Sequence, residues 1–124
     1  ECKALAHLHL GSNDICAEGV RSLAVGLKNS KTLARLDLRG NRIGAEGATR
    51  LAMVLGECEA LAHLDMGSNQ IGDEGASQMA EVLGDCRALA YLSLKSNDFG
   101  ADGAGRLAGA LGKCKALAHL NLSY

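Results

Sequence analysis

The chain has 124 residues and a formal net charge of −1 at pH 7, and 48 % of its residues are hydrophobic. This much apolar side chain argues against a disordered chain, and the near-neutral charge removes the basic surface that nucleic-acid binders present. No apolar run approaches the ~18 residues of a membrane span, and the opening residues lack the pattern of a signal peptide, so we expect no membrane association.

The sequence repeats itself every 28 residues without insertion or deletion. A unit of this size cannot bury its apolar residues alone, whereas stacked units can, so the period predicts a repeat array. The recurring positions include Asn13, Asn41, Asn69 and Asn97, then Leu5, Leu33, Leu61, Leu89 and Leu117, and then Gly19, Gly47, Gly75 and Gly103.

Each unit begins with the period of a strand. In residues 5–13 (LAHLHLGSN), Leu8 and Leu10 alternate with polar neighbours, as in a half-buried strand of five or six residues. The Asn that ends this segment falls where the chain turns away. We expect its side-chain amide to bond the backbone of its own turn and of the neighbouring turn. The Ile that follows two residues later is predicted to be in the core.

A helix of about ten residues is predicted next in each unit. Leu51 and Leu55, four residues apart in Ala-rich sequence, illustrate the spacing. An acidic residue such as Glu46 stands at the predicted helix start, where the helix dipole favours negative charge. A Gly such as Gly56 stands near the far end, as a left-handed helix stop requires. The pattern therefore predicts five parallel strands and four helices.

These residues resemble a known family. The frame LxxLxLxxN, followed by an Ile and then GxxxLxxxL, resembles the leucine-rich repeat. The 28-residue length, with Gly47-Ala48 and Leu51-Ala52 in the helix, is similar to its ribonuclease-inhibitor-like subtype, which also forms the C-terminal arrays of cytosolic nucleotide-binding oligomerisation receptors. The resemblance implies an α/β solenoid, a horseshoe segment with a parallel sheet on the concave face and helices on the convex face. It also implies protein recognition.

We expect one solenoid domain over residues 1–124, with about four and a half repeats and no evident caps. The chain begins in the middle of a return loop and stops at Tyr124, one residue before the next expected Asn. We interpret it as a fragment of a longer array, or as an excised or designed segment. Its end strands are predicted to expose apolar side chains and backbone edges that a neighbour should cover.

Alternate side chains of a strand face opposite ways, so three columns are predicted on the concave face. Arginine and aromatic residues favour a protein-binding surface, and mixed charge sets its specificity. The first column is His7, Arg35, His63, Tyr91, His119; the second is His9, Asp37, Asp65, Ser93, Asn121; the third is Gly11, Arg39, Gly67, Lys95, Ser123. The partner-binding residues that we predict are His7, His9, Arg35, Asp37, Arg39, His63, Asp65, Tyr91, Lys95 and His119.

Two other interpretations of the chain stay open. The concave face could be a solvated surface without a partner, while the chain is a structural subunit that associates through its uncapped ends. The face could also hold a metal or acid–base site, because strands ~4.8 Å apart bring neighbouring columns together. The candidates for that site are His7, His9, Asp37, His63 and Asp65. However, Arg35 stands between two of these histidines, and no Ser–His–acid set is visible. We therefore expect no enzyme, metal or cofactor.

All four histidines of the chain fall on the predicted concave face. Histidine side chains generally titrate near pH 6.5, so this face should gain positive charge between roughly pH 7 and 5.5. If the partner is acidic, its affinity should rise on acidification.

The five cysteines are an odd number, which fits poorly with a disulfide framework. Cys58, Cys86 and Cys114 share one position after the helix, with Cys2 as their counterpart, and we expect buried thiols there. Cys16 stands in a turn where the other units have Gly, which makes it the candidate for an exposed, reactive thiol and leaves its reactivity open. Free thiols suit a reducing compartment, which predicts a cytoplasmic protein.

Overall fold

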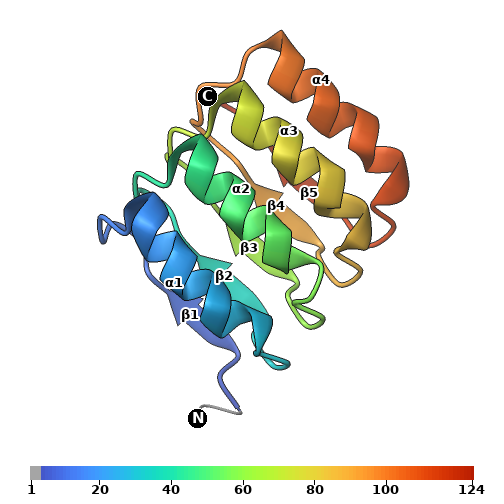
Figure 1. Cartoon of the computed structure of the whole chain (residues 1–124). Helices are drawn as coiled ribbons and strands as arrows, with labels where there is room; N and C mark the ends of the chain where they lie inside the picture. The colour runs from blue at the N-terminus through green and yellow to red at the C-terminus, as the bar shows by residue number, and fades with distance from the viewer. Residues whose placement is uncertain (1–3) are drawn as a thin grey trace.

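Five short parallel strands line up in chain order, and a helix follows each of the first four (Figure 1). The computed structural model of the chain describes residues 4–124. The strands are β1 (His7–His9), β2 (Arg35–Asp37), β3 (His63–Asp65), β4 (Tyr91–Ser93) and β5 (His119–Asn121). The helices are α1 (Cys16–Lys28), α2 (Gly44–Leu55), α3 (Gly72–Val82) and α4 (Ala101–Ala110), and the 3₁₀ turns η1 (Leu83–Asp85) and η2 (Leu111–Lys113) extend the last two.

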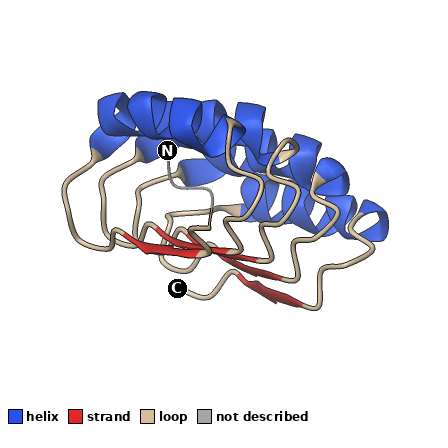
Figure 2. Ribbon diagram, turned by 90° about the horizontal axis from the view of Figure 1, so that it is seen from below, coloured by secondary structure: helices blue, strands red, loops and turns tan. Residues whose placement is uncertain are grey.

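The strands form one layer and the helices the other (Figure 2). Paired residues of neighbouring strands are always 28 apart, so Leu8 pairs with Leu36 and Leu36 with Leu64. The predicted α/β solenoid, with five parallel strands and four helices, is confirmed.

The core lies between the two layers, where the Leu at the centre of each inner strand meets the helices. Leu36 and Leu64 are fully buried, and so are Ile43 and Ile71 in the turns, as predicted. In the first turn the equivalent residue, Ile15, is only partly buried. Burial therefore comes from the neighbouring repeats rather than from the residues of one unit.

The strands are shorter than predicted. Each has three residues rather than five or six. Backbone hydrogen bonds between neighbouring repeats nevertheless continue past the strand end, because Leu38 N donates to Asp65 O (2.8 Å) and Gly40 N to Gly67 O (3.0 Å). Gly40 has a φ of +63°, which takes the chain out of extended geometry while the repeats stay bonded.

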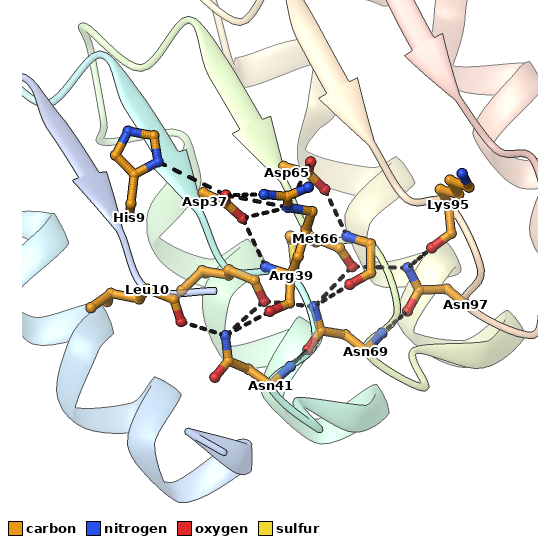
Figure 3. Close-up of polar contacts among 12 residues, drawn as sticks. His9, Leu10, Asp37, Arg39, Asn41, Asp65, Met66, Asn69, Lys95 and Asn97 are labelled. Carbon is orange, nitrogen blue, oxygen red and sulfur yellow. Dashed lines mark hydrogen bonds and ion pairs between the residues drawn. The ribbon is translucent and has the colours of Figure 1, made fainter. Parts of the chain in front are cut away.

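The turns that follow the strands are joined by a ladder of asparagine side chains (Figure 3). The amide nitrogen of Asn69 donates to Met66 O (2.9 Å) in its own turn and to Leu38 O (2.9 Å) in the preceding repeat. Its Oδ1 accepts from Asn41 N (2.8 Å), which is also in the preceding repeat. Asn69 is fully buried and keeps all its polar groups paired. The predicted role of the asparagines is therefore confirmed.

The helix ends differ from the prediction, although the acidic first turns are confirmed. Gly56 is right-handed (φ −64°), and Gly84 and Gly112 lie within 3₁₀ turns. The left-handed stop is therefore wrong, since each helix ends in tightened backbone turns that already bond its last carbonyls. Left-handed residues instead cluster between strand and helix: Ser12, Asp14, Cys16, Gly40, Arg42, Gly44, Ser68, Gln70, Gly72, Ser96 and Asp98.

The first repeat leaves apolar side chains uncovered on the side away from the second repeat, as predicted. Leu5 is 43 % exposed and Leu8 is only half-buried. A cavity of about 640 Å³ opens there between α1 and the loop before β2, and Leu23, Leu27 and Leu33 also line it. The apolar layer thus continues to the surface at this end.

Candidate partner-binding face

The strand register builds the first column without a break. Its members are successive pairing partners across the sheet: His7, Arg35, His63, Tyr91 and His119. In each strand the central Leu is the residue turned to the core, and the flanking residues are more exposed in β1, β2 and β3. The predicted placement of the columns is confirmed for these strands. Ser93 in the second column departs from the pattern, because it is buried (4 % exposed).

Three rings of the first column form a continuous stack. The His63 and Tyr91 rings are parallel within 3°, with centroids 4.0 Å apart, and the Tyr91 and His119 rings follow at 4.7 Å and 13°. Stacked rings hold each other upright on the sheet, which fixes three large side chains without a covalent link. Burial and the nearby Arg35 guanidinium lower the pKa of His63 below its usual 6.5, so this imidazole is the neutral form at pH 7.

A chain of opposite charges crosses the second and third columns (Figure 3). Arg39 lies between two carboxylates: its Nη2 is 2.9 Å from Asp37 Oδ2, and its Nε is 3.5 Å from Asp65 Oδ2. His9 Nδ1 adds a longer contact of 3.8 Å to Asp37. The hydrogen bonds that Arg39 donates hold the pKa of Asp37 below its usual value.

Two of the predicted residues have a structural task that the sequence analysis missed. Asp37 Oδ1 accepts from the backbone N–H of Arg39 (3.0 Å), and Asp65 Oδ1 accepts from that of Gly67 (2.9 Å). Each carboxylate thereby holds the chain just after its strand, as aspartates do in Asx turns. The signal was present in the sequence, because Asn121 stands at the same repeat position and makes the same bond to Ser123 N (2.9 Å).

The third column alternates between glycines and long side chains. A Cβ placed on Gly67 would lie 3.2 Å from Asp65 Oδ1 and 3.6 Å from Arg39 Cγ. The missing side chain therefore leaves the room through which Arg39 reaches Asp65. Lys95 is exposed, and within residues 4–124 it makes no ion pair. The structure thus groups His9, Asp37, Arg39 and Asp65 in one cluster and leaves Lys95 outside it.

The metal interpretation finds no converging donors. Among the described residues, no three His, Cys, Asp or Glu side chains are placed to share an ion. The space between the two aspartates is taken by the Arg39 guanidinium, which neutralises them in the way a cation would.

The thiols divide as the sequence analysis predicted. Cys16 is exposed, whereas Cys58 is buried (8 % exposed), and its Sγ lies 3.4 Å from Val54 O. Cys86 and Cys114 are intermediate in exposure, so the buried ladder is confirmed fully only for Cys58. Burial raises the pKa of Cys86 to about 12, which keeps this thiol protonated and unreactive. Cys2 lies outside the described residues.

Comparisons with known proteins agree with this architecture. A family model described as Leucine Rich repeat matches residues 1–24, 29–52, 58–80 and 85–108. No curated protein sequence matches the chain. A solved structure titled Leiomodin-1 Actin-Binding Site 2 superposes with a TM-score of 0.88 at 18 % identity, over 96 % of this chain and 70 % of that one. The tropomodulin C-terminal domain of Caenorhabditis elegans gives 0.86 at 17 %, over 98 % and 75 %.

At these identities the two structures show a shared fold. The leucine-rich repeats support a protein-interaction module as the general class of function. No helix within residues 4–124 is long and apolar enough to cross a membrane.

Proposed function

The chain belongs to the leucine-rich repeat family, and we propose that it recognises a protein partner through its concave face, the three columns of side chains on the open side of the sheet. The observation that carries this proposal is the stack of His63, Tyr91 and His119 beside Arg35. Tyrosine and arginine are enriched among the residues that dominate binding energies, and fixed side chains lose little entropy on binding.

Several residues of this face have no task inside the repeat. His7 is exposed at the start of the first column, and Lys95 is exposed in the third. The charges of Arg39, Asp37 and Asp65 are by contrast compensated within the sheet. We infer that the compensated cluster sets the shape of the face and that the first column and Lys95 supply most of the contacts.

The proposed protein is a binding module without catalytic activity, and we place it in the cytoplasm. The cysteines support the compartment, because Cys16, Cys58, Cys86 and Cys114 are all free thiols. The absence of an activated nucleophile on the concave face supports the binding role, since Ser93 is buried and has no adjacent histidine in the strand register.

Site-specific photo-crosslinking tests the proposal. A benzophenone amino acid at position 91 samples the concave face, and the same group at position 25 samples α1, where Val25 is 66 % exposed. We expect a discrete cross-linked protein only from position 91. The identified partner, or purified actin as a first candidate because the Leiomodin-1 structure is titled an actin-binding site, is then titrated against the purified chain.

The affinity of alanine variants for the cross-linked partner tests which residues make the contact. Arg35→Ala and Tyr91→Ala should each weaken binding by at least about tenfold if they are central contacts. Met53→Ala is the matched control, because Met53 is 73 % exposed on α2 at the position equivalent to Val25. Equal losses from Tyr91→Ala and Met53→Ala would contradict recognition through the concave face.

The second candidate function is assembly through the uncovered first repeat. The apolar cavity lined by Leu5, Leu8 and Leu23 favours it, because solvent-exposed apolar surface of this kind drives association. Light scattering over a tenfold concentration range tests it under reducing conditions. Assembly predicts larger species that Leu5→Glu disperses and Tyr91→Ala leaves intact, whereas a monomer throughout that range contradicts it.

A further inference from the structure

The charges of the concave face are separated by column. The first column has no acidic residue at any of its five positions: His7, Arg35, His63, Tyr91 and His119. Both acidic residues of the face, Asp37 and Asp65, are in the second column. Every side chain of the first column can donate a hydrogen bond, since imidazole, guanidinium and phenol all carry N–H or O–H groups.

The acidic residues of the neighbouring column are already paired. Arg39 bridges Asp37 (2.9 Å) and Asp65 (3.5 Å), so little of their negative charge is left to act on the first column. Lys95 adds a positive charge that no acid within residues 4–124 balances by an ion pair. The field along the first column is therefore positive even with neutral histidines.

One repeat position before the strands is mostly basic, although the same segments also carry the acidic residues Glu57 and Asp85. Lys31, Arg87 and Lys115 are exposed at one repeat position, and the single acid of that series is Glu59. Glu59 Oε1 is 3.6 Å from Lys31 Nζ, so it is compensated as well. Arg87 and Lys115 are left to extend the positive field on the entrance side of β4 and β5.

The column has the length of a short peptide. It crosses four strand spacings of ~4.8 Å, or roughly 19 Å, which is about the reach of six extended residues. We infer that an extended acidic peptide segment of about six residues, belonging to the partner protein, lies along the first column, with its carboxylates accepting from Arg35, the stacked rings and the end histidines. The inference rests on the proposed function and names the chemistry of its partner.

A peptide fits the charges of this face better than a nucleic acid does. Nucleic-acid binding depends on several arginines and lysines that each contact a phosphate. The first column has Arg35 as its single arginine or lysine, beside histidines and a tyrosine. The chain as a whole is also slightly acidic, with a net charge of −1.

Protonation of the histidines should strengthen such a contact. The titratable and charged groups that face the column are His7 and His9 on β1, Arg35 and Asp37 on β2, His63 and Asp65 on β3, Tyr91 on β4 and His119 on β5, together with Arg39 and Lys95. Between pH 7.5 and 5.5 aspartate stays ionised while histidines gain protons. Acidification therefore adds positive charge on the protein side only, although burial lowers the pKa of His63 and favours its neutral form.

The test is a titration of the purified chain with a rhodamine-labelled hexa-aspartate peptide, followed by fluorescence anisotropy. We expect saturable binding that weakens with added salt and tightens by roughly tenfold from pH 7.5 to 5.5, because several exposed ion pairs of modest strength are gained. A labelled hexalysine peptide and a labelled thymidine decanucleotide are the comparison probes, and neither should match the hexa-aspartate peptide.

Two sets of substitutions locate the contact. The concave set, Arg35→Gln, His63→Gln and His119→Gln, should abolish most of the binding and reduce its pH dependence. The convex set, Arg21→Gln, Arg50→Gln and Arg106→Gln on the helices, removes at least as much positive charge and should change binding less than twofold. Circular dichroism checks that each protein is folded, and Arg35→Gln alone replaces the concave set if that set unfolds.

The outcomes separate the two proposals. Absent hexa-aspartate binding, equal losses from both sets, or equal binding of the thymidine probe would overturn the acidic-peptide inference. The proposed function would survive that result if the photo-crosslinked partner still depended on Arg35 and Tyr91. It would fail with the inference if the partner bound equally well to Arg35→Ala and Tyr91→Ala.

Discussion

The first repeat and the third repeat have nearly the same pattern of residues but different environments. Leu64 and Asn69 are fully buried, whereas their equivalents Leu8 and Asn13 are half-buried and exposed. The difference arises because each inner unit is covered on both sides and the first unit on only one. The comparison shows that most of the stability of a repeat belongs to its contacts with neighbours.

The largest contrast is expected at the strand centre. Leu64→Ala should cost about 3–4 kcal/mol, because it leaves a cavity in a fully packed layer, and Leu8→Ala only about 1 kcal/mol, because part of that side chain already meets water. Urea unfolding followed by circular dichroism measures both. Equal costs would mean that the first repeat is covered in solution.

The asparagine ladder should give the next contrast. Asn69→Ala removes side-chain bonds to Asn41 N, Leu38 O and Met66 O and leaves these backbone groups buried, so we expect a loss of about 3 kcal/mol. The side chain of Asn13 donates only to carbonyls of its own turn in an exposed place, and Asn13→Ala should lose less than about 1 kcal/mol. The same unfolding measurement applies, and a larger loss at position 13 would refute the neighbour argument.

A gain in stability is expected at Cys16. This residue holds a φ of +55° at the position where Gly44 and Gly72 have +70° and +66°. Side chains disfavour this left-handed backbone, so Cys16→Gly should stabilise the chain by about 0.5–1 kcal/mol, seen as a higher melting temperature. Cys16→Ser is the control, because it keeps the Cβ and should bring no gain. A destabilising Cys16→Gly would show that the turn is not strained.

The smallest contrast concerns the second column, where the first repeat has His9 and the second has Asp37. The pKa of Asp37 is lowered in the folded state, chiefly by hydrogen bonds from Arg39, so its ionised form stabilises the fold at neutral pH and this contribution fades as pH falls below about 4. Asp37→Asn should therefore be less stable than the parent by at most about 1 kcal/mol at pH 7, with a gap that closes toward pH 3. A gap that stays constant as pH falls would contradict the stabilising role of the ionised carboxylate.

Most of the fold could be predicted from the 28-residue repeat. It placed the strands in register, put the first column in order and gave the asparagines their role, because an interval that repeats without error leaves only one way to stack the units. The resemblance to leucine-rich repeats added the arrangement of sheet and helices. Which side chains face outward then followed from the alternation along each strand.

Features that depend on backbone torsions did not follow from the pattern. Arg42 and Gln70 are left-handed although neither residue type favours that conformation. The backbone bonds to the next repeat make up for this, since Gly40 N and Gly44 N both find carbonyls there. The left-handed residues therefore lie between strand and helix rather than at the helix ends, where glycines in this conformation were predicted.

The repeat pattern also could not predict the features of the site that depend on how far a side chain extends. The sequence placed Asp37, Arg39 and Asp65 on one face but gave no reason for Arg39 to cross to the next strand. That step depends on the absence of a side chain at Gly67 and on the Asp65 carboxylate, which a backbone N–H holds in place. The ring stack likewise depends on rotamers that three different side chains adopt together.

The asparagine ladder also bears on how an array of this kind can change its length. Its rungs join Asn41 to residues 28, 26 and 31 positions away, always in the adjoining unit. A tandem duplication of any 28 consecutive residues, whichever residue it starts from, reproduces every donor with its acceptor. An insertion of another size between two asparagines would leave a rung without its partner unless it bulged out of the return loop. Growth by whole units thus preserves every hydrogen bond of the ladder. Insertions of other lengths can be tolerated in the loops on the opposite side of the unit.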